Sequence, residues 1–432
     1  MLFLTSFPKM AASLTPFGDI CASFASNSRI TAPGVSAHER SDNMFDKSPV
    51  FALGFRPFYL LAGLFALLAI PLWVLTFPGD SLTGNYLHGL AWHSHEMIFG
   101  FAVAVIAGFL LTAVRNWTGR PTPVGAALAL IAALWLFARV LMMSGPAALA
   151  ATADILFLPL LGVVVAIPII GSRNSRNYKL LVVIAGLTLA NTGYHLAMMG
   201  AVPPWLASAS LVLALDIFVI LIAIIGGRVT PAFIGNAVAD AKPRHIAAVE
   251  VTSFATLIII LVLGVSSRWV AIPQIGWVTV FAVAALAQGI RLWLWQPLRA
   301  RGNWLLMMLP VAYAWLPVTL ALRAIAVTGA VPVSAAHHTL TVGAIASLMM
   351  AMMTRSSLGH SGRPLVAGRA EIGAFVLLQL SAIVRVLGAS MFSSLYQESL
   401  YVSGALWTVA FAIFLWRYAP ILLRPRIDGR PG

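Results

Sequence analysis

The chain consists of long apolar stretches separated by short polar junctions rich in Gly and Pro. A transmembrane helix needs about 20 predominantly apolar residues, whereas a membrane β-barrel would alternate apolar and polar positions. Twelve stretches meet the helical requirement, at roughly 57–77, 90–113, 123–143, 147–170, 179–199, 206–226, 246–265, 269–293, 304–327, 334–354, 369–391 and 398–417. The pattern predicts an all-α, polytopic integral membrane bundle of about 12 transmembrane helices.

The two ends of the chain differ from this pattern. Residues 1–50 are rich in Ser, Ala, Asp and Asn, show no sustained period and lack the order of a signal peptide. We therefore predict a disordered tail there, and Met44, directly before the first apolar module, is an alternative start. Residues 51–420 form the predicted twelve-helix membrane domain, and residues 421–432 form a basic cytoplasmic tail.

Lysine and arginine residues alternate between the two sides of the predicted bundle. The segments before helix 1 and after each even-numbered helix hold 22 of the 27. The loops after the odd-numbered helices hold only Arg268, and the other four lie within the spans. Because positive charge is retained in cytoplasmic loops, the pattern predicts that the N- and C-termini are both cytoplasmic.

Composition favours the lipid bilayer as the main partner. Only 9% of the residues are charged and the mean hydropathy is +0.93, whereas soluble domains carry about 25% charged residues. The net charge of +14 fits cytoplasmic loops facing anionic lipid, so we expect no nucleic-acid partner. The single cysteine, Cys21, excludes an internal disulfide and a c-type haem attachment motif. A bound metal would use His, Met, carboxylate or backbone ligands.

Six histidines fall in the outer part of the predicted bilayer. They come from three segments: His88, His93 and His95 at the start of helix 2, His195 near the end of helix 5, and His337 and His338 at the start of helix 10. Alone, His88 or His195 fits an interfacial residue bonded to a carbonyl or water. Together the set predicts a bound metal or haem, because imidazole is the commonest metal ligand and polar groups at membrane depth usually mark function.

Helix geometry limits which of these side chains can cooperate. His93 and Met97 are four residues apart and share one helix face, which could supply a nitrogen and a thioether. His93 and His95 point about 200° apart around the helix, so they would serve two sites, or one would orient the other. His337 and His338 are about 100° apart and need not share a ligand.

Three arginines inside the spans, Arg139, Arg323 and Arg385, lie at a similar depth in the outer thirds of their helices. Buried guanidinium groups require anions. Asp154 and Glu96 are candidate partners for Arg139. The two arginines left over suggest an anionic ligand such as a pair of haem propionates, and water-filled crevices or backbone carbonyls are the alternative partners.

Other polar positions carry weaker expectations. Asp216, near the middle of helix 6, has no obvious partner in the sequence, and Arg291, at a cytoplasmic helix end, is expected to snorkel to the interface. The run Gly226-Gly227-Arg228-Val229-Thr230-Pro231 is expected to end helix 6. No convincing internal repeat is visible.

Several motifs resemble those of the NnrS family. They are Gly54-Phe55-Arg56-Pro57-Phe58, Trp92-His93-Ser94-His95-Glu96-Met97, Phe99-Gly100-Phe101, Ala107-Gly108-Phe109-Leu110-Leu111-Thr112-Ala113, Asn116-Trp117-Thr118-Gly119, Gly226-Gly227-Arg228 with Pro231 and Asn236, His338-Thr339-Leu340-Thr341-Val342-Gly343-Ala344, Met353-Thr354-Arg355 and Leu358-Gly359-His360-Ser361-Gly362-Arg363. The resemblance covers roughly residues 50–420. Its matched histidines are His93, His95, His338 and His360, with His337 adjacent. No ligand assignment transfers with it, so the ligand choices rest on depth and spacing.

The resemblance implies a haem- and copper-containing protein of the bacterial inner membrane, associated with denitrification and nitric oxide stress. The leading hypothesis is a haem b near the outer face, with copper as a second cofactor. Helices 2 and 10 would supply imidazoles, and Arg139, Arg323 or Arg385 would meet the propionates. With nitric oxide as its ligand, such a site could sense, buffer or turn over the gas, or protect other iron centres. Catalysis and the redox partner are left open.

Two alternatives remain from the sequence. A secondary transporter of a small anionic solute would share the twelve-helix layout with both ends inside, and buried arginines with Asp216 could bind the solute. The lack of an internal repeat counts against it. A membrane nitric oxide reductase would need a haem–metal pair and an electron donor.

Overall fold

The computed structural model describes residues 44–77 and 86–430, which belong to one compact unit, Asn43–Gly432. All regular secondary structure in these residues is helical, and twelve helices are long and apolar enough to cross a membrane. The predicted number of spans is therefore confirmed. The predicted disordered tail lies outside the described residues up to residue 43, and beyond it the short helices α2 (Met44–Lys47) and η1 (Pro49–Phe51) precede the first span.

Ten of the spans are single helices or a helix with one short preceding turn, and two are compound. The simple spans are α3 (Phe55–Thr76), α6 (Gly125–Ser144), α7 (Ala147–Gly171), η3 (Ser175–Asn177) with α8 (Tyr178–Met198), α9 (Trp205–Ala237), α10 (Ala247–Ser266), α11 (Gln274–Leu294), α12 (Trp304–Val327), α15 (Arg369–Ser390) and α16 (Tyr396–Leu423). Short turns at η4 (Pro297–Ala300) and η6 (Ser393–Leu395) join neighbouring spans.

The compound spans are the second and the tenth, and each contains a π-helical segment. The second span consists of α4 (Gly89–His95), the π-helix η2 (Glu96–Ala102) and α5 (Val103–Thr118). The tenth consists of α13 (Val333–His338), the π-helix η5 (Thr339–Ala346) and α14 (Ser347–His360). Single π-helical turns inside α-helices are rare and are frequent at functional sites.

These two spans also share a local pattern around their π-helices. In each, a histidine directly precedes the π-helix, a glycine follows five residues later, and a glycine with positive φ comes just after the span: His95, Gly100 and Gly119 in one, and His338, Gly343 and Gly362 in the other. The shared backbone feature is a local change of helical period, which side-chain types alone do not show.

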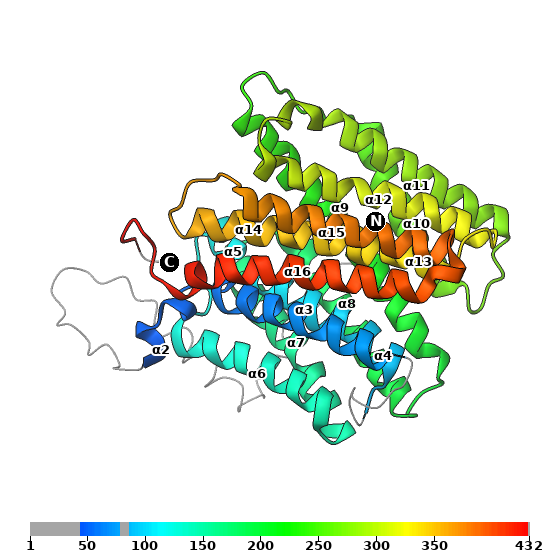
Figure 1. The fold of residues 1–432 in the computed structure, drawn as a ribbon, viewed down its shortest axis with the longest axis horizontal. Coiled ribbons are helices and arrows are strands. Elements are labelled where there is room, and N and C mark those ends of the chain that lie inside the picture. The colour runs from blue at the N-terminus through cyan, green and yellow to red at the C-terminus, as the bar shows by residue number, and fades with distance from the viewer. Residues whose placement is uncertain (1–43, 78–85, 431–432) are drawn as a thin grey trace, which may run out of the picture. The chain divides into compact units, whose positions relative to one another are not determined.

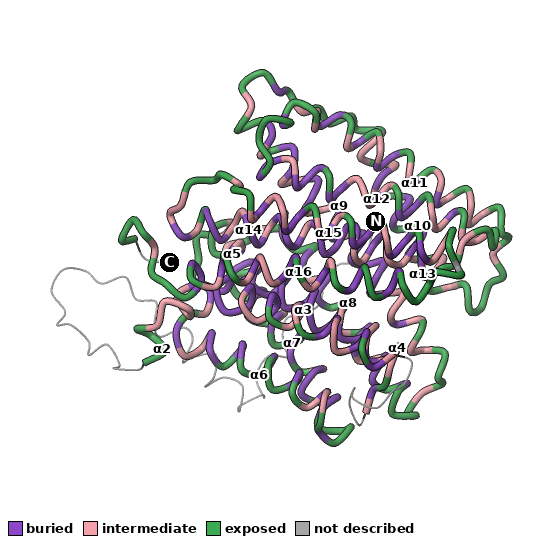
Figure 2. The backbone as a smooth tube through the Cα atoms, in the orientation of Figure 1, coloured by how far each residue is buried: buried purple, intermediate pink, exposed green. Residues whose placement is uncertain are grey.

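Packing places the second span at the centre and the seventh and eighth at the edge. The most apolar stretch of the second span is 83% buried, against 22% for α10. The last helix, α16, packs along the first span, α3, and α15 packs along α16 (Figure 1). Figure 2 shows buried backbone concentrated along the central helices and exposed backbone along α6, α10 and α11. The exposed apolar faces of the spans imply contact with a lipid bilayer.

The sixth span, α9, ends later than its sequence suggests. The run from Gly226 to Pro231 was expected to end the helix, but α9 continues through it to Ala237. The two glycines allow close packing: a Cβ on Gly226 would lie 2.7 Å from the Tyr313 ring, and one on Gly227 would meet the Arg291 guanidinium. These glycines therefore mark close approach between helices.

Candidate functional site

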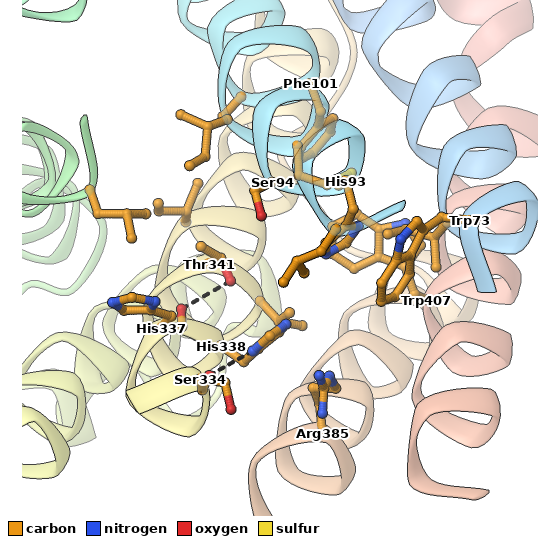
Figure 3. A pocket seen from close by; sticks show the side chains of 18 of the residues that line it. Trp73, His93, Ser94, Phe101, Ser334, His337, His338, Thr341, Arg385 and Trp407 are labelled. Carbon is orange, nitrogen blue, oxygen red and sulfur yellow. Dashed lines mark hydrogen bonds between the residues drawn. The ribbon is translucent and has the colours of Figure 1, made fainter. Parts of the chain in front are cut away.

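A cavity of about 300 Å³ lies between the second, sixth and tenth spans, near the end of the bundle at which α4 and α13 begin. Its lining is mainly apolar, and its polar members include His93, His337, His338 and Arg385 (Figure 3). The sequence-predicted thioether of Met97 also lines it. Pockets for cofactors usually enclose about 300 to 1,000 Å³ and combine apolar walls with a few polar groups. The cavity thus brings together residues about 240 positions apart in the chain.

His93 is held against an aromatic wall of this cavity. Its ring stacks on the indole of Trp73 with ring centroids 4.0 Å apart and an angle of 20° between the planes. The Trp73 indole N–H donates to the carbonyl oxygen of Gly89 at 3.0 Å, which fixes the indole. The Nδ1 atom of His93 is buried and has no hydrogen-bond partner in the described part of the chain. An unpaired buried ring nitrogen is costly, and a bound group would relieve that cost.

His338 faces the same cavity from the tenth span. Its Nδ1 lies 2.6 Å from the carbonyl oxygen of Ser334, one turn earlier in α13. Because a carbonyl oxygen only accepts, Nδ1 carries the proton and Nε2 carries the lone pair. A hydrogen bond from one ring nitrogen is the usual way in which proteins orient a histidine whose other nitrogen binds a metal. His337 also lines the cavity, but its ring points away from His338 (Figure 3).

Arg385 reaches the cavity from α15. One terminal nitrogen of its guanidinium donates to the hydroxyl of Tyr396 at 3.0 Å, and the guanidinium lies over the Tyr396 ring. The other terminal nitrogen, Nη1, is buried and has no partner among the described residues. Figure 3 shows the guanidinium group directed toward the space beside His338. The side chain therefore offers a positive charge and a free donor to an anionic group in the cavity.

A second constellation lies on the other side of α4, away from the cavity. The Nε2 atoms of His95 and His195 approach the same oxygen, Asp154 Oδ2, at 3.3 Å and 3.0 Å. All three side chains are buried, and their ligand atoms lie within 4.8 Å of one another, so the trio could hold a metal ion. We call His95, Asp154 and His195 the His–Asp cluster.

Neighbouring residues orient both imidazoles of the His–Asp cluster. Nδ1 of His95 lies 2.9 Å from Glu96 Oε1, and Nδ1 of His195 lies 3.1 Å from the Tyr86 hydroxyl. The Tyr86 hydroxyl can itself donate to the backbone oxygen of His195 at 3.3 Å. Burial raises the pKa of Tyr86 to about 12, so this hydroxyl keeps its proton at neutral pH. Nε2 of His195 is directed at Asp154 Oδ2, whereas Nε2 of His95 lies closer to Asn191 Oδ1, at 3.0 Å, than to Asp154 Oδ2, at 3.3 Å.

Arg139 binds both carboxylates around the cluster. It donates to Glu96 Oε1 at 2.6 Å and forms an ion pair with Asp154 Oδ1. The sequence-predicted partners of Arg139 are therefore confirmed. Asn191 adds a bond from its amide to Asp154 Oδ2 at 2.7 Å. Two carboxylates and one guanidinium leave a formal charge of −1, which a bound cation or a proton would balance.

Three charged side chains within the spans have partners that sequence reasoning missed. Arg323 donates to Asp216 Oδ1 at 2.5 Å, so the expectation that both were left without a partner is wrong. The two side chains come from α12 and α9, and their proximity is set by helix packing. Arg291 does not snorkel: it is buried and binds Glu250, the carbonyl of Ala223 and the Tyr313 hydroxyl.

Two further described histidines, His88 and His360, lie apart from both sites. His88 is exposed just before α4. His360 lies at the opposite end of the tenth span from His338, where its ring contacts Phe55. Sequence reasoning also missed Trp73, Tyr86, Asn191 and Tyr396 as supports. Aromatic and amide side chains are common in membrane helices, so only the fold distinguishes them.

The fold and sites define a polytopic α-helical membrane protein with a histidine-lined cavity and a separate buried His–Asp cluster. The family model described as NnrS protein matches residues 49–426, and the chain belongs to the NnrS family. No curated protein matches the chain at a significant level of similarity. Membership of this family suggests that the chain binds a metal or haem, and the His–Asp cluster is one place that could hold a metal.

Proposed function

We propose that the chain binds haem b in the cavity between the second and tenth spans and acts in the bacterial response to nitric oxide. Family membership is consistent with such a role. The observation that carries the proposal is the meeting of His93 and His338, from two distant spans, at one apolar cavity beside Arg385. Each of these three side chains presents a nitrogen that the described residues leave without a hydrogen-bond partner.

The residues present fit a haem in chemistry as well as in position. Two buried nitrogens beside the cavity, His93 Nδ1 and Arg385 Nη1, have no partner among the described residues. Both would gain one from an iron porphyrin with acidic side groups. The mainly apolar lining suits a flat apolar macrocycle. Water or a small anion would satisfy the guanidinium but would leave most of this wall without contacts.

We assign distinct roles to the polar residues. His338 is the iron ligand, because the bond to Ser334 fixes its ring and leaves Nε2 as the donor. His93, stacked on Trp73, would offer a second ring nitrogen to the bound group. Arg385 holds a propionate, and Tyr396 orients the guanidinium. Bound haem would supply an iron that takes nitric oxide as a ligand.

The ion-paired arginines are assigned structural roles in this proposal. Arg139 is engaged by Glu96 and Asp154, and Arg323 is engaged by Asp216. Drawing either toward a propionate would strand a buried carboxylate, which typically costs about 3–5 kcal/mol. Arg385 is therefore the one intramembrane arginine that we assign to the cofactor.

We assign the second cofactor, copper, to the His–Asp cluster. Imidazole nitrogens suit copper among the transition metals, and a carboxylate completes the set. The formal charge of −1 from Glu96, Asp154 and Arg139 favours a cation. Copper analysis of purified wild type beside His195→Ala tests this assignment. Stoichiometric copper that is lost in the variant supports it, and equal copper in both proteins contradicts it.

We further propose that the protein lies in the bacterial inner membrane with both termini in the cytoplasm. The basic loops lie at the end of the bundle opposite the cavity and the His–Asp cluster, and positive loops are retained in the cytoplasm. The cavity and the His–Asp cluster would then lie toward the periplasm. A gas arriving from outside the cell would meet this side first.

One observation favours a membrane nitric oxide reductase as a second candidate function. The cavity and the His–Asp cluster take His93 and His95 from the same short helix, α4. Two cofactor sites that share a helix could exchange electrons. Consumption of nitric oxide by the purified protein with a chemical reductant would favour the reductase, and binding without consumption would favour a sensor or buffer.

Purified protein tests the main proposal directly. Wild type should show the optical bands of a b-type haem that shift when nitric oxide is added. His338→Ala should lose the haem, and His360→Ala, a substitution at the far end of the same span, should retain it. A folded His338→Ala protein with full haem content and an unchanged spectrum would contradict the assignment.

A further inference from the structure

A second cavity, of about 90 Å³, lies further along the same helices. It is bounded mainly by α5, α9 and α14, and its walls are almost wholly apolar. Phe218 and Ile345 line both this cavity and the histidine-lined one. Each side chain therefore has the larger cavity on one side and the smaller cavity on the other. We call the smaller space the apolar cavity.

The position of the apolar cavity follows from the helical rise. Ile345 lies seven residues after His338, and Met352 lies a further seven residues on. At the α-helical rise of 1.5 Å per residue the second interval is roughly 10 Å along the span, and the first, which runs through the π-helix η5, is somewhat shorter. The apolar cavity thus extends from the floor of the histidine-lined cavity into the middle of the transmembrane region, where the hydrocarbon of the bilayer would surround the bundle.

The walls of the apolar cavity select its occupant. Phe109, Ile222 and Met349 present only carbon and sulfur to the space, and Thr230 is the one hydroxyl-bearing residue that lines it. A water molecule needs two to four polar partners, so such a space favours apolar occupants, and apolar cavities in proteins bind xenon. The volume is too small for a drug-sized ligand. A small uncharged molecule remains as the occupant.

We propose that the apolar cavity binds small uncharged gas molecules and passes them between the bilayer core and the histidine-lined cavity. Phe218 and Ile345 form the partition that a gas molecule must cross. The binding of gas stands on the cavity alone, whereas delivery of nitric oxide rests on the proposed function. The same walls would exclude a charged solute or water. The route would therefore admit gas to the histidine-lined cavity without admitting water.

Xenon is the probe for the site itself, because it needs no haem. Met349→Phe places a larger side chain at a residue that lines the apolar cavity and not the histidine-lined cavity, and Met349→Leu tests whether loss of the thioether alone has an effect. The proposal expects xenon binding, observed by ¹²⁹Xe NMR in detergent, in wild type and Met349→Leu but not in Met349→Phe. Wild type without xenon binding, or Met349→Phe with equal binding, would overturn it.

Gas rebinding after flash photolysis tests the route. In reduced, haem-loaded protein, Met349→Phe should slow the rebinding of carbon monoxide severalfold while haem content and spectrum stay unchanged. Val376→Phe, on the exposed face of α15, adds a ring without entering the cavity and should rebind at the wild-type rate. Equal rates in all three proteins would overturn the route.

Purified protein that binds xenon but no haem would refute the proposed function and support the gas site.

Discussion

Nδ1 of His338 lies 2.6 Å from the carbonyl oxygen of Ser334 within the same short helix, α13. This bond fixes the ring and its tautomer before any ligand binds. His337, the adjacent residue, has a different direction and lacks this anchor in the described structure (Figure 3). The pair therefore provides a matched comparison for the cofactor site.

The first prediction distinguishes His338 from His337 by their contribution to haem binding. His338→Gly should lose haem, and added imidazole should restore the optical bands, because it can occupy the vacated space and bind iron. His337→Gly should keep most of its haem without imidazole. Titration of haem into membranes or purified protein measures both. Haem loss in His337→Gly together with retention in His338→Gly would reverse the assignment.

The second prediction concerns Arg385. A hydrogen bond to a charged group is worth about 1.5–3 kcal/mol, so Arg385→Leu should weaken haem binding by roughly ten- to a hundredfold. Tyr396→Phe removes only the hydroxyl that orients the guanidinium and should have a smaller effect. The rate of haem transfer to apomyoglobin measures the difference. Identical transfer rates from wild type and Arg385→Leu would exclude a propionate contact.

The third prediction concerns the ion pair between Arg139 and Asp154. Both side chains are buried, and removing one partner of a buried pair typically costs about 3–5 kcal/mol. Asp154→Asn should therefore lower the melting temperature clearly. Asp428→Asn removes the partner of Arg426 at the exposed C-terminal end and should change it little. Similar small shifts for both variants would show that the buried network is not a major source of stability.

The fourth prediction uses the π-helix of the second span. A Cβ on Gly100 would lie 2.9 Å from Arg139 Nη1 and 3.1 Å from Glu96 Oε2, so Gly100→Ala must displace the ion pair. Overpacking of this kind typically costs about 1–3 kcal/mol. Gly373→Ala places a methyl group where nothing lies within 4 Å and should be neutral or stabilising. Thermal unfolding followed by tryptophan fluorescence compares them. A Gly100→Ala protein as stable as wild type would contradict the predicted overpacking against Arg139 and Glu96.

The fifth prediction concerns orientation in the membrane. With Cys21 replaced by Ser, a cysteine at Thr328 should react with an impermeant thiol reagent in spheroplasts, because this loop lies at the end of the bundle where α13 begins. A cysteine at Gly302, in a basic loop at the other end, should react only after lysis. The opposite labelling pattern would invert the proposed topology.

The sequence predicted the spans because a crossing helix needs only length and apolar character. It also separated His93 from His95, since a rotation of about 200° is a property of any α-helix. In the structure, His93 lines the cavity and His95 belongs to the His–Asp cluster. The geometry of a single helix was enough to predict that these two histidines point in different directions.

The contacts between helices could not be predicted in the same way. Arg323 and Asp216 are 107 residues apart, and only the packing of α12 beside α9 brings them together. The end of α9 was misplaced because Gly226 and Gly227 are usually read as breaks, whereas here they admit Tyr313 and Arg291. The π-helices were not predicted either, because side-chain spacing does not show which backbone carbonyl accepts the hydrogen bond from each backbone N–H.

The most direct measurement is the haem content of the purified, folded protein, by optical spectrum and pyridine haemochrome assay, after expression with sufficient iron. Our account predicts a stoichiometric b-type haem whose bands shift on addition of nitric oxide. A folded wild-type protein that carries only traces of haem, and takes up none when it is supplied, would contradict the central claim.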